Sequence, residues 1–121
     1  MGAGEDLNTV LERIRFYDSP IAMWVFDSDS FAFLEVNNAA IQKYGYSRAE
    51  FLSMTILDIR PHEDIPALLR EQLQEHRRTA LNEVWTHRTK NGTLVEVEIS
   101  SRPLVFQGRQ AELVIALDHT S

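Results

Sequence analysis

The last third of the chain has the periodicity of β-strands that bury one face. Val95, Val97 and Ile99 alternate with Glu96 and Glu98, so one side of this segment is apolar and the other is charged. Similar runs, rich in Val, Ile, Thr and Trp, lie on either side of it. Three strands are therefore predicted, over residues 82–88, 93–100 and 112–118.

The segments between these strands carry hairpin signals. Asn91-Gly92 is a strong signal for a two-residue turn, and Gln107-Gly108-Arg109 is a weaker signal for a hairpin loop. Short loops of this kind join strands that lie side by side and run in opposite directions. The three strands are therefore expected to be antiparallel neighbours in one sheet.

Two further strands are predicted nearer the start of the chain. Residues 21–26 are almost wholly apolar, and residues 27–30, Asp-Ser-Asp-Ser, favour a turn because their side chains bond to nearby backbone. A second apolar run follows over residues 31–36. This pattern is typical of a strand hairpin.

The middle of the chain is expected to form short helices and then a longer one. Asn37 can cap the first helix, and Ser47 with Glu50 forms a capping box for the next. Apolar residues from Ile65 to Leu73 then follow one face of a helix that ends near residue 78. This order predicts an α+β domain with one five-stranded antiparallel sheet and helices on one face.

An amphipathic helix is predicted ahead of this domain. Residues 5–17 carry apolar side chains at spacings of three and four, and Pro20 favours an end near residue 18. The apolar face must be covered, either by the sheet of the same chain or by a second copy. The residues of this face are Leu7, Val10, Leu11, Ile14 and Tyr17.

Charge and residue usage exclude several classes of protein. The net charge of -6 repels phosphate backbones, so no nucleic-acid partner is expected. No apolar run approaches the ~20 residues needed to span a bilayer, so we expect no direct membrane contact. The chain has no cysteine, which excludes disulfides and thiol nucleophiles and agrees with the cytoplasmic location that we expect.

The sequence has no arrangement typical of catalysis or metal binding. The serines lack a Gly-x-Ser-x-Gly elbow, and Glu96 and Glu98 alternate with valines as on a solvated strand face. The four histidines are scattered, and no two have the spacing that places metal ligands on one helical face. We therefore expect no catalytic residue, no metal site and no enzymatic activity.

Segments of the chain, in order, resemble the PAS sensory domain family. They are Ser-Pro-Ile-Ala at 19–22, Val-Asn-Asn-Ala-Ala at 36–40 with Tyr-Gly-Tyr-Ser at 44–47, Arg-Pro-His-Glu-Asp at 60–64, His-Arg-Thr-Lys-Asn-Gly at 87–92 and Asp-His-Thr at 118–120. The resemblance implies the strand order 2-1-5-4-3. It also implies a PAS domain over residues 19–121 and a flanking dimerisation helix over residues 1–18.

The resemblance further implies a small-molecule pocket between the long helix and the inner face of the sheet. A ligand there would be small and largely apolar, with few polar anchors. The same side chains can instead be ordinary core, since each large apolar residue contributes about 1.5 to 3 kcal/mol when fully buried. The pocket candidates are Trp24, Phe26, Ile41, Tyr44, Leu69, Leu73, Val97 and Ile99.

The family resemblance narrows the choice of cofactor without identifying one. In light-oxygen-voltage members a photochemical cysteine reacts with flavin, and Ile56 stands at the aligned position here. Haem-binding members use a histidine on the long helix, where His76 lies among charged neighbours typical of a wet surface. Flavin and haem are therefore disfavoured, and the cofactor is unknown.

The function implied by the resemblance is sensory. Asp118 and Thr120 lie in the closing triplet that links sensor to effector in this family, so a signal would pass to an effector domain beyond residue 121. A homodimer is expected, within a parent such as a sensor histidine kinase or a cyclic-dinucleotide enzyme. The alternative is a small cone-shaped α+β enzyme or carrier of the nuclear-transport-factor-like type, which would need acids or histidines facing its pocket.

Overall fold

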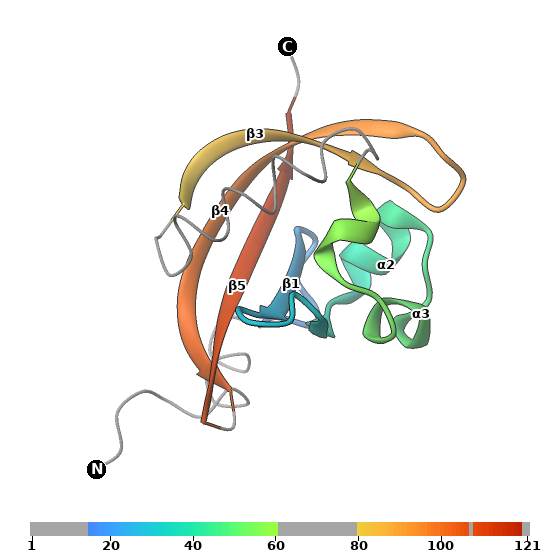
Figure 1. Cartoon of the computed structure of the whole chain (residues 1–121). Helices are drawn as coiled ribbons and strands as arrows, with labels where there is room; N and C mark the ends of the chain where they lie inside the picture. Colours follow the sequence, from blue (N-terminus) through green and yellow to red (C-terminus); the bar gives the residue numbers. More distant parts are fainter. Residues whose placement is uncertain (1–14, 61–79, 107, 120–121) are drawn as a thin grey trace.

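The chain folds into one curved antiparallel sheet with short helices on its concave side (Figure 1). In this computed structural model the structure describes residues 15–60, 80–106 and 108–119. Its elements are β1 (Ala22–Asp27), β2 (Phe33–Val36), α2 (Asn38–Tyr44), α3 (Arg48–Leu52), the 3₁₀ helix η1 (Ile56–Ile59), β3 (Ala80–Arg88), β4 (Leu94–Phe106) and β5 (Arg109–Asp118).

The strand order is β2-β1-β5-β4-β3, with every neighbouring pair antiparallel. The first strand therefore lies between β2 and the last strand, β5. The strands β3 and β4 curve over the side of the sheet that carries α2, α3 and η1 (Figure 1). The α+β class, the five-stranded sheet and its order are confirmed.

The predicted helix caps are also confirmed. The Asn37 side chain accepts a hydrogen bond from the backbone of Ala40 at 3.0 Å, and Gly45 ends α2 with a left-handed φ of 86°. Ser47 and Glu50 form both hydrogen bonds of a capping box at the start of α3. These caps fix where the short helices begin, and hence which side chains they turn toward the sheet.

Several strands have different limits from those predicted. The strand predicted to end at residue 100 continues to Phe106, although it contains Pro103, which cannot donate a ladder hydrogen bond. The last strand begins at Arg109 rather than residue 112. The second strand begins at Phe33 rather than residue 31, because Phe31 has a left-handed φ of 68°.

The turn between β3 and β4 is longer by one residue than the two-residue turn predicted. The backbone N–H of Thr89 donates to the carbonyl of Thr93 at 2.9 Å, and the N–H of Gly92 donates to Thr89 at 3.0 Å. The central turn residues are therefore Lys90 and Asn91, followed by Gly92 with a φ of 93°. This is the three-residue hairpin that ends in a left-handed glycine.

Apolar side chains pack on both faces of the sheet, and β1 is buried along its whole length. The inner cluster faces the helices, and its buried residues are Ala22, Trp24, Phe26, Phe33, Val36, Ala40, Tyr44, Phe51, Ile56, Ile59, Val97, Ile99, Val114 and Ala116. The outer cluster lies on the opposite face, and its buried residues are Phe16, Met23, Val25, Ala111 and Leu113.

The predicted leading helix does not reach Tyr17. Residues 15–18 form turns, and Arg15 has a left-handed φ of 54°. As a result Phe16, not Tyr17, points into the outer cluster, and Tyr17 is 42% exposed. Residues 1–14, with the rest of the expected apolar stripe, lie outside the described residues.

Candidate functional site

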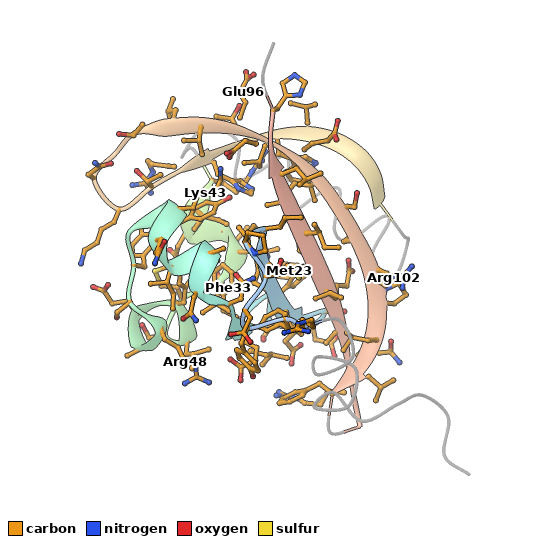
Figure 2. The ribbon with its side chains drawn as sticks, turned by 180° about the vertical axis from the view of Figure 1, so that it is seen from behind. Met23, Phe33, Lys43, Arg48, Glu96 and Arg102 are labelled. Carbon is orange, nitrogen blue, oxygen red and sulfur yellow. The ribbon has the colours of Figure 1, made fainter. Side chains whose placement is uncertain are left out.

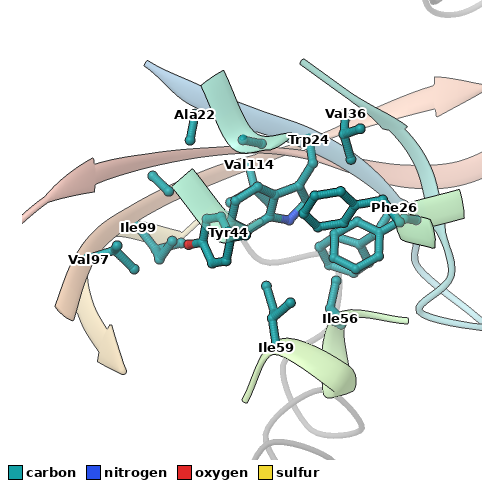
Figure 3. Close-up of a cluster of buried hydrophobic side chains, with 14 residues drawn as sticks. Ala22, Trp24, Phe26, Val36, Tyr44, Ile56, Ile59, Val97, Ile99 and Val114 are labelled. Atoms are coloured by element: carbon teal, nitrogen blue, oxygen red, sulfur yellow. The ribbon is translucent and has the colours of Figure 1, made fainter. Parts of the chain in front are cut away.

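Aromatic rings fill the inner cluster in contact with one another (Figure 3). The ring centroid of Trp24 lies 5.7 Å from Tyr44, 6.1 Å from Phe33 and 5.8 Å from His87. Phe33 in turn contacts Phe51 at 5.0 Å. Most of these pairs meet edge to face, the arrangement that ring quadrupoles favour.

A polar pair lies within this aromatic surface. The Tyr44 Oη and the His87 Nδ1 atoms are 2.6 Å apart, and both side chains are buried. Tyr44 comes from the last turn of α2 and His87 from β3, so the bond joins a helix to an edge strand. His87 was not among the predicted pocket residues. Its position two residues after Trp85 on a strand is the signal that could have placed it on the inner face.

Both members of this pair are neutral near pH 7. Burial lowers the pKa of His87 to about 3, and the cations Arg60 and Lys43 act in the same direction. Burial raises the pKa of the Tyr44 phenol well above its usual value. The site therefore presents an uncharged imidazole and an uncharged phenol.

Two arginines, Arg60 directly after η1 and Arg88 on β3, connect η1 with the edge strand. The Arg60 guanidinium lies 4.2 Å from the centre of the Trp85 ring, and its Nη1 donates to the carbonyl of Thr86 at 3.2 Å. Arg88 reaches the carbonyl of Asp58 at 3.5 Å. These contacts hold the end of η1 against the edge strand beside His87.

The exit of β5 is tied to the same helix. Lys43 lies next to Tyr44 on α2 (Figure 2) and forms an ion pair with Asp118, the last residue of β5. The Lys43 side chain is mostly buried, whereas Asp118 is 74% exposed. The backbone of His119 donates to Glu96 at 3.1 Å. The expected output residue Asp118 thus has a partner, Lys43, that sequence patterns did not indicate.

The remaining predicted site residues are distributed as follows. Five pocket candidates are buried in the inner cluster: Trp24, Phe26, Tyr44, Val97 and Ile99. Ile41 is half-buried against that cluster. Outside the described residues lie Leu69 and Leu73 of the pocket, His76, Thr120 and the leading-helix residues Leu7, Val10, Leu11 and Ile14.

The described residues do not form the site required by the alternative enzyme or carrier. That fold needs acids or histidines converging in its cleft, whereas His87 is hydrogen-bonded to a phenol here. Across residues 15–60, 80–106 and 108–119, no three metal-ligand side chains come together. Over the same ranges no helix is long and apolar enough to cross a membrane.

Comparison with known proteins places the chain in a family. The family model described as PAS domain matches residues 20–121. The methyl sulfide methyltransferase-associated sensor of Methanosarcina acetivorans is 25% identical over 99 residues, which cover 81% of this chain and 10% of that protein. The chain therefore spans about a tenth of the length of this curated relative.

Solved structures agree with this assignment. A PAS domain from a two-component sensor histidine kinase has a TM-score of 0.75 at 24% identity, covering 93% of this chain and 97% of that one. A domain of a sensory box sensor histidine kinase/response regulator from Geobacter sulfurreducens has a TM-score of 0.75 at 25% identity, covering 92% and 94%. The curved sheet and its short helices are thus shared with domains of sensor kinases.

Proposed function

The chain belongs to the PAS domain family, and from this premise we propose that it is the sensory module of a larger cytoplasmic signalling protein. PAS domains are in general sensory modules without catalysis, and similar domains occur in sensor histidine kinases. The proposed parent carries an effector beyond residue 121, such as a histidine kinase or a cyclic-dinucleotide enzyme. Because the chain belongs to this family, it is not the nuclear-transport-factor-like enzyme or carrier that was the alternative.

The observation that carries the proposal is the double attachment of α2. Tyr44 bonds to His87 inside the core, and the preceding residue, Lys43, pairs with Asp118 at the exit of the sheet. A ligand in the inner cluster, or a rearranged homodimer, can shift this helix and with it the exit. A ligand can shift the equilibrium between two positions of α2 only by its difference in affinity for those two positions.

A chimeric kinase tests the signalling role. The C-terminus of the chain is fused to the catalytic region of a sensor histidine kinase, and autophosphorylation is measured. Asp118→Asn should change the rate at least threefold, because it removes the tie between α2 and the exit. Lys90→Met, which removes an exposed ion pair with Glu50 elsewhere, is the matched control. Equal rates for the two variants would count against the proposal.

The proposed homodimer depends on the apolar stripe of the leading residues. Leu11→Glu combined with Ile14→Glu should convert a dimer into a monomer, because each substitution puts a charge on the stripe. Sedimentation equilibrium measures the mass of both proteins. The same monomeric mass for the intact chain and the variant would exclude pairing through residues 1–18.

A bound ligand is tested by extraction. The purified chain is denatured in organic solvent, and the released small molecules are identified by mass spectrometry. We expect a small, largely apolar compound in stoichiometric amount. An empty extract would favour a module that acts through dimer rearrangement alone.

A further inference from the structure

The turn between β3 and β4 contacts the helices as well as joining two strands. The backbone N–H of Lys90 donates to the carbonyl of Tyr44, the last residue of α2, at 2.9 Å. The Lys90 Nζ atom also lies 2.9 Å from a carboxylate oxygen of Glu50 on α3. The position of Lys90 in the turn therefore determines how this hairpin contacts α2 and α3.

The next two residues, Asn91 and Gly92, form a chemically labile pair. Asparagine is a thermolabile residue, because the backbone nitrogen of the residue that follows can attack its side-chain amide. Gly92 has no Cβ to hinder this attack, and among the described residues no atom beyond its chain neighbours lies within 4 Å of the place a Cβ would take. Both residues are exposed, so water reaches the pair.

The hydrogen bonds of Asn91 support this reaction. Its Oδ1 atom accepts from the Thr89 hydroxyl group at 2.6 Å and from the Thr93 N–H at 3.2 Å. These donors stabilise the negative charge that develops on the oxygen when the amide carbon is attacked. The N–H of Gly92 must first leave the carbonyl of Thr89, to which it donates at 3.0 Å. Because that bond lies between the end of β3 and the start of β4, its opening leaves both strands paired.

We propose that Asn91 is a modification site, at which water converts the side-chain amide to a carboxylate through a cyclic imide. The Gly92 nitrogen forms a bond to Cγ of Asn91, the bond from Cγ to Nδ2 breaks, and ammonia leaves with the proton of the Gly92 amide. Water then opens the imide at either of its two C–N bonds to that nitrogen. One product is aspartate. In the other, isoaspartate, the main chain passes through the former side chain and is longer by one carbon.

The two products have different effects on the turn. Aspartate retains an oxygen that can accept from Thr89 and Thr93, and the main chain keeps its length. Isoaspartate lengthens a short hairpin loop whose length fixes the register of the strands. Lys90 then loses its place at the carbonyl of Tyr44, and the hairpin is released from α2. Formation of isoaspartate is therefore a slow, irreversible change in how the hairpin contacts the helices.

Mass spectrometry of the folded chain, held in warm and mildly alkaline buffer, tests the modification. The peptide that contains Asn91 should gain about 1 Da, because an amide group is replaced by a hydroxyl group. Fragmentation that distinguishes the two isomers should identify isoaspartate in this peptide. The peptide with Asn37 and Asn38 is the internal control. It should gain mass at least tenfold more slowly, because Asn37 is buried and Asn38 is followed by Ala39 on a helix.

A variant and an exchange measurement test the role of the turn. Thr89→Val should slow the mass gain at least threefold, because it removes the shorter of the two bonds to Oδ1. Amide exchange at Lys90 should rise at least fivefold in the separated isoaspartate product and stay unchanged in Asn91→Asp, which adds the charge alone. The proposal would be overturned by no mass gain at Asn91, by an equal or faster gain in Thr89→Val, or by unchanged exchange at Lys90 in isoaspartate. The first and last results need no variant, so they decide even if Thr89→Val does not fold.

Discussion

The inner cluster contains contacting aromatic rings and a buried polar pair, whereas the outer cluster consists mainly of aliphatic side chains around Phe16. Both clusters share β1, whose alternate residues Trp24 and Met23 point to opposite faces. The inner face therefore combines the packing of rings with a buried hydrogen bond. The outer face offers apolar contact, which suits packing by a chain segment or another protomer.

One side chain connects the two faces. The amide oxygen of Asn37 accepts from the backbone of Met23 and of Ala40, each at 3.0 Å. Its amide nitrogen donates to the carbonyl of Phe16 at 3.0 Å and of Ile21 at 2.8 Å. The cap of an inner-face helix thus also holds the residue that closes the outer cluster.

The two faces should differ most in how much the free energy of unfolding falls when one ring is removed from each. Trp24→Ala should lower the free energy of unfolding by about 3–5 kcal/mol, because it leaves a cavity bordered by Tyr44, Phe33 and His87. Phe16→Ala should cost less, about 3 kcal/mol, because the outer cluster is the smaller of the two among the described residues. Urea unfolding measures both, and a larger cost for Phe16 would reverse this ranking of the two clusters.

Removal of the connecting amide should affect both faces together. Asn37→Ala should cost about 3 kcal/mol, because several backbone groups lose a buried partner at once. Amide exchange should rise at Met23 and Ala40. Asn38→Ala is the control, since Asn38 is exposed and should cost less than about 0.5 kcal/mol. Equal losses of unfolding free energy in Asn37→Ala and Asn38→Ala would contradict the role of Asn37 in connecting the two clusters.

The pH dependence of stability should report on the inner face. The folded pKa of His87 is about 3, below the unfolded value near 6.5, so the unfolded chain binds more protons between these limits. Stability should therefore fall as the pH falls from 6.5 toward 3, by a factor approaching about ten in the unfolding equilibrium per pH unit. His87→Phe should lose this slope. An unchanged slope in thermal unfolding would contradict a neutral, buried imidazole.

A separate acid response belongs to the end of β1. Burial alone would raise the pKa of Asp27, but hydrogen bonds from the backbone of Ser30 and Asp29 and the charge of Arg109 hold it below its usual value. Its stabilisation is therefore present above the unfolded pKa near 4 and is lost as the pH falls further. Asp27→Asn should remove only the loss of stability below about pH 4. This separates the Asp27 response from the response of His87 at higher pH.

The smallest effects are expected at ion pairs near the surface. Asp118→Asn and Lys90→Met should each change stability by less than about 1 kcal/mol, because at least one partner in each pair is well exposed. Only Asp118→Asn should speed amide exchange at His119, which follows directly after the exit. Equal exchange at His119 in both variants would mean that the tie to α2 does not order the exit.

The sequence could predict those features that depend on neighbouring residues. Alternation at Val95, Val97 and Ile99 indicated a strand, and the capping box at Ser47 and Glu50 indicated a helix start. The strand order followed from the family resemblance rather than from these patterns. The predicted limits of a strand were wrong where the backbone conformation of one residue interrupts the strand, as at Phe31 with its left-handed φ.

The parts of the site that could not be predicted depend on contacts between distant segments. Tyr44 and His87 are 43 residues apart, and nothing in either local pattern pairs them. Phe16 occupies the outer cluster because the chain turns at Arg15, which helical spacing alone does not reveal. The pocket candidates came from the family resemblance, and alternation independently placed only Val97 and Ile99 on one face.

The most direct test is the protonation state of His87 in the ligand-free chain. A long-range ¹H–¹⁵N spectrum at pH 7 distinguishes the two neutral tautomers and the cation. We predict a neutral ring with its proton on Nε2, as required if Tyr44 donates to Nδ1. A doubly protonated ring, or one with its proton on Nδ1, would contradict the neutral Tyr44–His87 pair that ties α2 to β3.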